Sequence, residues 1–344
     1  MIKNYVHKPA ISVIIPMYNS ERFIAQCLSS VLIQTFKDFE VIVVDDCSED
    51  KSVALTETFV ELFNGRLNLI ELKKNTGCPG EPRNLGIMHA KGKYIYFLDS
   101  DDVLVPTALE ELFKYTEDKE LDLIHSEKNF VPLMTDDSNN FKYNEDINEN
   151  TKFRTIESMA YDKPTLETND PAERIIRFSE KRFWTTVWRN LIRRDLIVNN
   201  KLSFINTRIL EDDVFTFECL CCANKVLHIP NIFYIYRMRK SSISHDSLAR
   251  EVGTRIDTMI KIFKALDDFM NNMKIFTEQP ELRYKVFDFF MKKLTRPLRK
   301  VPPYELDSLL RKKFSENPSA NIPLLTYSFG MMNQFRNASE CEDV

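Results

Sequence analysis

Glycine is scarce in this sequence, and long apolar runs are absent. Only 7 of the 344 residues are glycine, no G-x-G-x-x-G follows the first apolar segment, and there is no G-x-x-x-x-G-K-[ST] loop. These absences weigh against a dinucleotide-dependent enzyme and against a P-loop NTPase. No stretch reaches the length of a transmembrane helix, and residues 1–9 are too short and polar for a secretory signal peptide. The sequence therefore predicts a cytoplasmic protein.

Nucleic-acid binding and a disulfide framework also lack support. The net charge is -4, which offers no overall attraction to a polyanion. The seven cysteines are odd in number and scattered, unlike the cysteines of a disulfide-stabilised domain. Cys219 and Cys222 have C-x-x-C spacing, but no second pair completes a zinc site. Their apolar surroundings predict buried thiols.

The N-terminal third alternates short apolar segments with helical periodicity. We predict strands at Ile11–Pro16, Phe39–Val44, Leu67–Leu72, Tyr94–Leu98 and Leu121–Ser126. We predict one helix that is capped by Ser20 and further helices that start at Ser52, at Leu85 and near Pro106. Strands that are almost wholly apolar are typical of parallel sheets with both faces covered. This alternation predicts an α/β fold with a mostly parallel, doubly wound sheet.

Carboxylates directly follow two of these strands. Asp99, Asp101 and Asp102 come after Tyr94–Leu98, and a pair of aspartates ends the second strand. Open α/β sheets bind ligands at the carboxyl ends of their strands, and oxygens that only accept hydrogen bonds suit a hard divalent cation. The pattern predicts a metal that holds the phosphates of a nucleotide. The alternative is an Asx-rich turn that caps the next helix.

A turn-rich segment at residues 75–84 contains Gly77 and Gly80. Glycine in such a loop is consistent with a backbone that comes close to a ligand. Since no glycine-rich phosphate loop is present, a bound phosphate would have to be held by a metal and by Arg83.

The middle of the chain has a weaker pattern with a few informative clusters. Met134–Thr151 is polar and predicts a loop. Both tryptophans, Trp184 and Trp188, lie in one segment, where core packing is favoured over a sugar-stacking wall. Glu211–Asp213 opens an apolar helix, so these acids are either favourable partners of the helix dipole or groups with a chemical role.

The last hundred residues predict helices. Beyond Asp246 apolar residues recur at helical spacing, and Glu281–Lys313 is rich in lysine and arginine, with phenylalanines among them. We interpret this segment as the solvated basic face of a small helical domain. The alternative is a peripheral contact with an anionic membrane surface.

An ordered set of short motifs runs through the first 245 residues. The set comprises Pro16-x-Tyr-Asn19, Val43-Val-Asp-Asp46, Asn75-Thr-Gly77, Pro82-Arg-Asn84, Asp99-Ser-Asp-Asp102, Trp188-x-Asn190, Glu211-Asp-x-x-Phe215 and Tyr236-Arg237. Their combination resembles the family-two inverting glycosyltransferases, which use nucleotide sugars and have the GT-A fold. Residues 77–84 resemble the branch that contains wall teichoic acid glycosyltransferases. The resemblance implies a Rossmann-like catalytic domain at residues 1–245, with donor and acceptor halves that meet near residue 126, and a helical extension at residues 246–344.

The resemblance also implies roles for individual residues. A UDP-sugar would contact Pro16, Tyr18, Asn19, Asp46, Arg83, Asn84, Asp99, Ser100 and Asp102. In this set Tyr18 would lie against the uracil, and Asp46 would accept its N3 proton. Asp101 and Asp99 of the D-x-D motif would bind Mn²⁺ or Mg²⁺, with His245 as a further candidate ligand. The other histidines are interpreted as ordinary surface or core residues.

The implied reaction is sugar transfer through an oxocarbenium-like transition state, with UDP as the leaving group. A metal would stabilise the charge that grows on that group. Asp212 would act as the general base that takes the proton of an acceptor hydroxyl. Glu211 would orient Asp212 or its loop through Arg237 or Arg239. A base on the face opposite the leaving group would invert the anomeric configuration.

The expected acceptor is a cell-surface glycan or glycopolymer, free or lipid-linked, and a homo-oligomer is a further possibility. The two alternatives to a glycosyltransferase are a nucleotidyltransferase and a non-catalytic scaffold. A nucleotidyltransferase would normally need a glycine-rich basic loop after the first strand, which Met17–Ser20 does not supply. A non-catalytic scaffold would be expected to have degraded carboxylate motifs, whereas those at residues 99–102 and 211–213 are intact. The sugar, the linkage and the preferred metal stay open.

Overall fold

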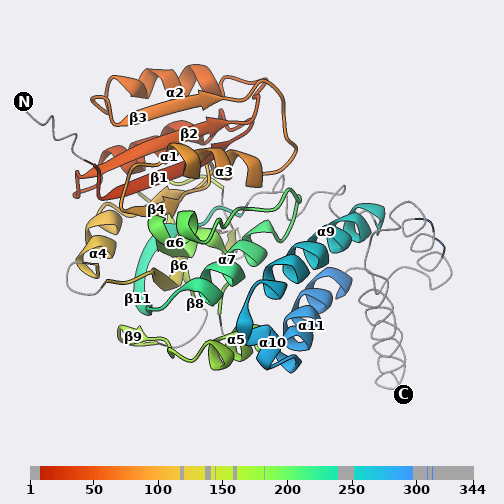
Figure 1. Ribbon diagram of the computed structural model, residues 1–344. Coiled ribbons are helices and arrows are strands. Elements are labelled where there is room, and N and C mark those ends of the chain that lie inside the picture. Colours follow the sequence, from red (N-terminus) through yellow and green to blue (C-terminus); the bar gives the residue numbers. More distant parts are fainter. Residues whose placement is uncertain are drawn as a thin grey trace, which may run out of the picture. The chain divides into compact units, whose positions relative to one another are not determined.

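The computed structural model describes residues 8–116, 120–135, 141–143, 145–157, 161–181, 183–238 and 252–296, together with Ser308 and Lys312. The chain divides into two compact units (Figure 1). One, here called the sheet unit, comprises residues 1–174 and 181–240, and the other, the helical unit, comprises residues 175–180 and 241–344. The predicted boundary after residue 245, like Arg239 and His245, lies outside the described residues, so that boundary stays a prediction.

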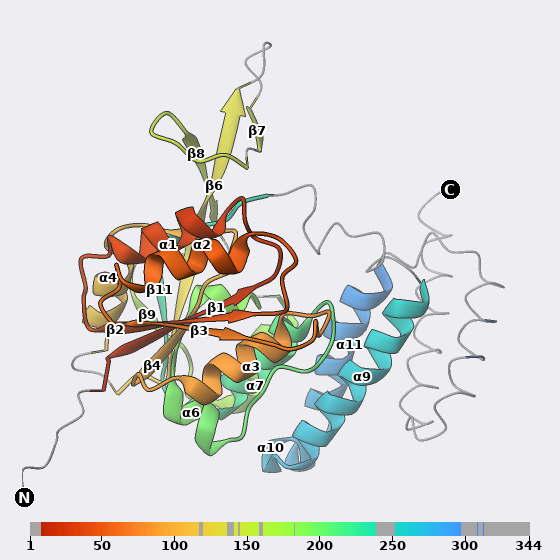
Figure 2. The same cartoon turned by 90° about the horizontal axis from the view of Figure 1, so that it is seen from above.

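The first half of the sheet unit is a parallel βα repeat. Its strands are β1 (Ile11–Met17), β2 (Phe39–Asp45), β3 (Leu67–Glu71) and β4 (Tyr94–Phe97), and they pair in parallel in the order β3-β2-β1-β4. The connecting helices are α1 (Ile24–Leu32), α2 (Ser52–Val60) and α3 (Gly80–His89). Helices α1 and α2 lie on one face of these strands and α3 on the other (Figure 2). The strand order reverses at β1, where doubly wound sheets bind ligands.

The sheet continues beyond β4 with mixed directions. Next in order are β10 (Asn190–Arg193), β6 (Leu123–Thr135), β11 (Val226–Ile235) and β5 (Val103–Leu104), and short strands β7 (Phe141–Tyr143), β8 (Lys152–Glu157) and β9 (Thr165–Leu166) pair with β6 or β11. β10 runs antiparallel to both β4 and β6, whereas β6 and β11 are parallel. The remaining elements of this unit are α4 (Ala108–Lys114), η1 (Val187–Arg189), α6 (Arg194–Asn199) and α7 (Glu211–Cys222). The predicted fifth strand thus pairs with β10 and β11, and β10 separates it from β4.

The core explains why α3 lies close to the sheet. The strand residues of β1 are all buried, as are the apolar residues of β4, which fits strands covered on both faces. A Cβ atom on Gly86 would lie only 2.4 Å from Cγ2 of Ile14. Glycine at this position therefore allows α3 to pack directly on β1.

Three predictions of local structure were wrong. Helix α3 begins at Gly80 instead of Leu85, because Pro82 is compatible with a first helical turn. The side chain of Ser20 does not cap α1; its hydroxyl bonds to that of Ser100 at 2.7 Å. The predicted loop Met134–Thr151 contains the end of β6 and all of β7, since antiparallel pairing uses backbone groups and does not require apolar side chains.

The helical unit contains α9 (Val252–Asn271), α10 (Lys274–Glu278) and α11 (Glu281–Thr295). Helix α5 (Pro171–Ser179) begins in the sheet unit, and residues 175–180 belong to the helical unit. Phe287 stacks on Phe263 with ring centroids 5.2 Å apart, and Phe289 packs against Phe178 at 4.7 Å. These phenylalanines are core residues, so they do not form the membrane-facing surface that was considered for this segment. Among the described helices none is long and apolar enough to cross a bilayer.

Candidate active site

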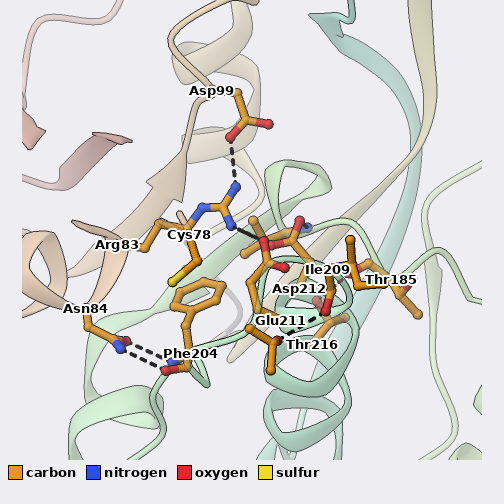
Figure 3. Close-up of polar contacts among 12 residues, drawn as sticks. Cys78, Arg83, Asn84, Asp99, Thr185, Phe204, Ile209, Glu211, Asp212 and Thr216 are labelled. Atoms are coloured by element: carbon orange, nitrogen blue, oxygen red, sulfur yellow. Dashed lines mark hydrogen bonds and ion pairs between the residues drawn. The ribbon is translucent and has the colours of Figure 1, made fainter. Parts of the chain in front are cut away.

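One buried arginine gathers three carboxylates at the carboxyl end of the sheet. Arg83 of α3 is 3% exposed. Its Nη1 donates to Oε1 of Glu211 at 3.0 Å and to Oδ1 of Asp212 at 2.6 Å, and its Nη2 donates to Oδ1 of Asp99 at 2.9 Å. Figure 3 shows the guanidinium between Asp99 on one side and the two acids of α7 on the other. The structure thus joins motifs that are far apart in the sequence.

Burial and charge set the protonation of this cluster. Burial raises the pKa of Glu211, and the nearby charge of Asp212 adds to this effect, while Arg83 opposes both. Burial also raises the pKa of Asp212, against the opposing charge of Arg83. Burial alone would lower the pKa of Arg83, but Asp212, Asp99 and Glu211 together raise it. The guanidinium is therefore permanently charged, and a proton that enters the cluster binds a carboxylate.

The segment before α7 is held against α3 by an amide pair. Nδ2 of Asn84 donates to the carbonyl of Phe204 at 2.8 Å, and the backbone N–H of Phe204 donates to Oδ1 of Asn84 at 2.8 Å. The Phe204 ring lies under Arg83, with the guanidinium carbon 5.3 Å from its centroid, and it stacks on Phe215 of α7 at 3.9 Å. Asn84 therefore fixes the segment that precedes α7. Its contact with the UDP-sugar stays a prediction.

The side chain of Asp102 is buried, and both of its oxygens accept hydrogen bonds from the chain. It is 1% exposed, and its oxygens accept from the hydroxyl of Tyr234 at 2.6 Å and from the backbone N–H of Arg237 at 2.7 Å. Burial raises its pKa well above the usual range, helped by Asp101 and Asp99. Arg237 also donates to the backbone carbonyl of Asp101 at 2.7 Å. Both oxygens of Asp102 thus have partners within the chain, and its predicted contact with the UDP-sugar stays a prediction.

The expected link between Glu211 and Arg237 is absent from the described contacts. Glu211 pairs with Arg83, whereas the guanidinium of Arg237 contacts the Asp101 carbonyl and the side chain of Gln26. The prediction that Glu211 acts through Arg237 was wrong, because Arg237 follows β11 and is held at the turn after β4. The arginine that pairs with Glu211 is Arg83.

The residues expected at the uridine end lie around the ends of β1 and β2. Pro16 is buried within β1, and Tyr18 is 47% exposed. The amide oxygen of Asn19 accepts from the backbone N–H of Glu49 at 2.9 Å. Asp46 is buried and accepts from the backbone N–H and the hydroxyl of Thr76 at 2.8 and 2.9 Å. Its predicted contact with uracil would have to share these oxygens.

The acidic turn offers oxygen ligands, but it does not contain a preformed metal cage. Among the described residues there is no group of three or more histidine, cysteine or acidic side chains placed to hold a metal ion. Asp99 keeps a second carboxylate oxygen beyond its bond to Arg83, and Figure 3 shows this oxygen turned away from the guanidinium. A set of carboxylate oxygens, completed by ligands from a diphosphate, fits Mn²⁺ or Mg²⁺.

The aromatic and cysteine predictions have clear outcomes. Trp188 is buried and stacks on Tyr234 at 4.2 Å, which confirms core packing for this tryptophan. Trp184 is 37% exposed, with the guanidinium of Arg189 4.7 Å from its ring centroid. Cys219 and Cys221 are buried, as predicted, whereas Cys222 is only partly buried. Burial raises the pKa of all three thiols.

Sequence reasoning missed two residues that shape the site. Tyr234 and Phe204 touch the candidate residues directly, through a hydroxyl and through a ring face. Tyr234 lies beside other aromatic residues of one strand, and Phe204 lies in a segment of mixed polar and apolar residues. Neither position carries a local signal that distinguishes it from a core aromatic residue.

Comparison with known proteins agrees with this geometry. The model of glycosyl transferase family 2 matches residues 12–183, half of the chain. Glycosyltransferase GlyG of Streptococcus pneumoniae is 28% identical over 236 residues, which cover 68% of this chain and 72% of GlyG. The poly(ribitol-phosphate) beta-N-acetylglucosaminyltransferase TarP of Staphylococcus aureus is 29% identical over 261 residues, covering 74% of this chain and 72% of TarP.

A solved structure resembles the fold closely. The crystal structure of S. aureus TarS 1-349 in complex with UDP-GlcNAc aligns with a TM-score of 0.66 and 23% identity, covering 87% of this chain and 78% of that one. This likeness confirms the predicted α/β fold with its sheet flanked by helices. Together with the family match over half of the sequence, it leads to one identification: the chain belongs to glycosyl transferase family 2 and is a glycosyltransferase.

Proposed function

We propose that this protein is a metal-dependent, inverting glycosyltransferase that moves a sugar from a UDP-sugar to a hydroxyl of a cell-surface glycopolymer. The observation that carries the proposal is the convergence of Asp99, Glu211 and Asp212 on Arg83 at the carboxyl end of β4. UDP-GlcNAc is the first donor to test, because TarP is named as an N-acetylglucosaminyltransferase and TarS was crystallised with UDP-GlcNAc. A poly(ribitol phosphate) chain is the first acceptor to test for the same reason.

Asp212 is proposed as the general base. Its side chain is 18% exposed, compared with 8% for Glu211, so it is the more accessible of the two to an acceptor hydroxyl. Burial raises its pKa, and a more basic carboxylate is a better proton acceptor near neutral pH. Arg83 and the backbone N–H of Val187, at 2.6 and 3.3 Å, hold its two oxygens. Glu211 shares Arg83 and so helps to fix the orientation of Asp212.

Asp99 and Asp101 are proposed to hold Mn²⁺ or Mg²⁺. Three carboxylates share the guanidinium of Arg83, which leaves two negative charges in excess when all three are ionised. Such a site attracts a divalent cation and would repel the diphosphate of a donor in the absence of one. When bound, the metal neutralises charge on the leaving diphosphate. Tyr18 is proposed to stack on the uracil, for which its exposed ring is suited.

The first experiment is calorimetric titration of the full chain with UDP, with and without Mn²⁺, followed by UDP-GlcNAc and other UDP-sugars. We expect UDP binding that strengthens when Mn²⁺ is present. Release of UDP from UDP-GlcNAc in the presence of poly(ribitol phosphate) then tests transfer, and the anomeric configuration of the product tests inversion. Failure of UDP to bind with Mn²⁺ present would refute the proposed donor class. The proposed cytoplasmic location, a membrane contact and a homo-oligomer need separate measurements on cells and on the purified chain.

A further inference from the structure

A single buried hydroxyl joins both ends of the acidic turn after β4. The Oη atom of Tyr234, on β11, accepts from the backbone N–H of Asp99 at 3.2 Å and donates to Oδ2 of Asp102 at 2.6 Å. Tyr234 is 2% exposed. Within the turn, the N–H of Asp102 donates to the carbonyl of Asp99 at 3.0 Å. These three bonds form a closed loop around residues 99–102.

Arg237, the second residue after β11, supports the same turn from another side. The backbone N–H of Arg237 donates to Oδ1 of Asp102 at 2.7 Å, and its Nη1 donates to the carbonyl of Asp101 at 2.7 Å. Gln26 of α1 accepts a further hydrogen bond from this guanidinium. The end of β11 thus contacts Asp99, Asp101 and Asp102.

The tyrosine ring is itself fixed by packing. It stacks on Trp188 with ring centroids 4.2 Å apart and an interplanar angle of 18°. An aromatic ring held in this way places its hydroxyl with little freedom. The hydrogen bonds of that hydroxyl therefore fix the turn relative to β11.

The buried carboxyl group of Asp102 needs an explanation, because burying a polar or charged group without hydrogen-bond partners is costly. Both of its oxygens accept hydrogen bonds from the chain itself, so it is compensated internally and has no need of a ligand. This arrangement is expected of a residue that shapes a site without touching the substrate. Polar groups that hold metal ligands in place typically act in this way, through hydrogen bonds and without contact with the substrate.

We propose that Tyr234 is a positioning residue that, through its hydroxyl and Asp102, sets the backbone of residues 99–102 and thereby orients the carboxylates of Asp99 and Asp101. The geometric part of this inference concerns the turn alone. Its consequence for metal binding rests on the proposed function.

The test is the variant Tyr234→Phe, which removes one oxygen and keeps the stacked ring. The matched control is Tyr94→Phe, because Tyr94 is equally buried in the same sheet and its hydroxyl donates to the carbonyl of Leu121 at 3.4 Å, away from the turn. Amide hydrogen exchange without any ligand is measured first. We expect faster exchange in the peptide covering residues 98–103 of Tyr234→Phe, because the N–H of Asp99 loses its acceptor, and no such change in Tyr94→Phe.

The second measurement is calorimetric titration of UDP at a series of Mn²⁺ concentrations. Loss of a group that orients metal ligands typically weakens metal affinity about 10- to 100-fold, so Tyr234→Phe should need that much more Mn²⁺ to reach the UDP affinity of the wild type. UDP binding without metal should stay as it is in the wild type. Asp102→Asn replaces one acceptor oxygen with a donor and should have the same effect, which provides a second variant if Tyr234→Phe does not fold.

The outcomes separate the inference from the proposed function. If residues 98–103 exchange at the wild-type rate in both Tyr234→Phe and Asp102→Asn, the positioning role of Tyr234 is refuted, whatever the protein binds. Faster exchange with an unchanged Mn²⁺ requirement would refute the orientation of metal ligands. If the wild type itself fails to bind UDP with Mn²⁺, the proposed function fails, and the exchange measurement still decides the role of Tyr234 in the turn.

Discussion

Two buried histidines in the sheet unit are predicted to affect stability with opposite pH dependence. His228 of β11 lies between two glutamates, with Nδ1 2.5 Å from Oε1 of Glu127 and Nε2 2.8 Å from Oε2 of Glu167. His125 of β6 lies beside it, with ring centroids 5.6 Å apart, and its Nδ1 bonds to Oδ1 of Asn190 at 2.7 Å. Both rings are fully buried. The perturbation is replacement of each histidine, in turn, by glutamine.

The surroundings shift the two pKa values in opposite directions. Burial lowers the pKa of His228, but the hydrogen bonds and charges of Glu127 and Glu167 outweigh burial and raise it overall. Burial lowers the pKa of His125 well below its usual value, and the charge of His228 adds to this effect. His228 therefore tends to be the charged member of the pair and His125 the neutral member.

The signs follow from proton linkage. The stabilisation from His228 is fully present below the pKa of an unfolded histidine, about 6.5, and is lost as pH rises through the raised folded pKa. The folded pKa of His125 is lowered, so its contribution is full above about pH 6.5 and is lost as pH falls towards the lowered value. Each unit of pKa shift corresponds to about 1.4 kcal/mol of unfolding free energy.

The magnitude for His228→Gln follows from its partners. Removing the cation leaves Glu127 and Glu167, both buried, without their charge partner, and breaking a buried ion pair typically costs about 3–5 kcal/mol. We expect a loss of this size at about pH 5.5. At about pH 8.5 the loss should be smaller, by about 1.4 kcal/mol for each unit by which the folded pKa of His228 is raised. His125→Gln should show the reverse order, with the smaller loss at the acidic pH.

The assay is urea unfolding followed by tryptophan fluorescence. Both tryptophans of the chain lie in the sheet unit, so the signal reports the unit that contains the two histidines. His89→Gln is the control, because His89 is exposed on α3 and should leave stability nearly unchanged at each pH. Equal losses for His228→Gln at the acidic and the alkaline pH would refute the assignment of a charged His228.

Three further predictions concern the candidate site and the sheet. Arg83→Met should lower the unfolding free energy measured in urea by roughly 3–5 kcal/mol and abolish sugar transfer. The control Arg174→Met removes an equally buried guanidinium that donates to backbone carbonyls, and it should keep transfer. Transfer by the Arg83 variant would contradict the role of Arg83 in the active site. Asp212→Asn should abolish transfer and leave calorimetric UDP binding nearly unchanged, and wild-type turnover would exclude Asp212 as the base. Gly92→Ala should destabilise the sheet unit by roughly 1–3 kcal/mol, because its Cβ would lie 2.5 Å from the backbone nitrogen of Ser12; an unchanged thermal midpoint would show that the strand can adjust.

The local pattern of side chains was sufficient to predict much of the sheet. The strands β1 to β4 begin where the apolar segments begin and end within one or two residues of the predicted positions, because strands buried on both faces must be apolar along their length. The alternation of these segments with helices was sufficient to predict the parallel pairing of β1 to β4, since parallel strands need such connections. Beyond β4 most of the strand pairs are antiparallel, which the sequence pattern did not predict. The motifs that follow them were sufficient to predict the family.

Partners that are distant in the sequence were decided only by the tertiary structure. The insertion of β10 between β4 and β6 depends on backbone pairing between segments about 95 and about 65 residues apart, for which no local pattern is required. Sequence reasoning assigned Arg83 to the pyrophosphate or the sugar and linked Glu211 to Arg237 or Arg239. The fold places the side chains of Arg83 and Glu211 3.0 Å apart. Charged side chains can pair with any opposite charge within reach, so their partners are set by which elements the fold brings together. For the same reason the role of Tyr234 became visible only where β11 meets the turn after β4.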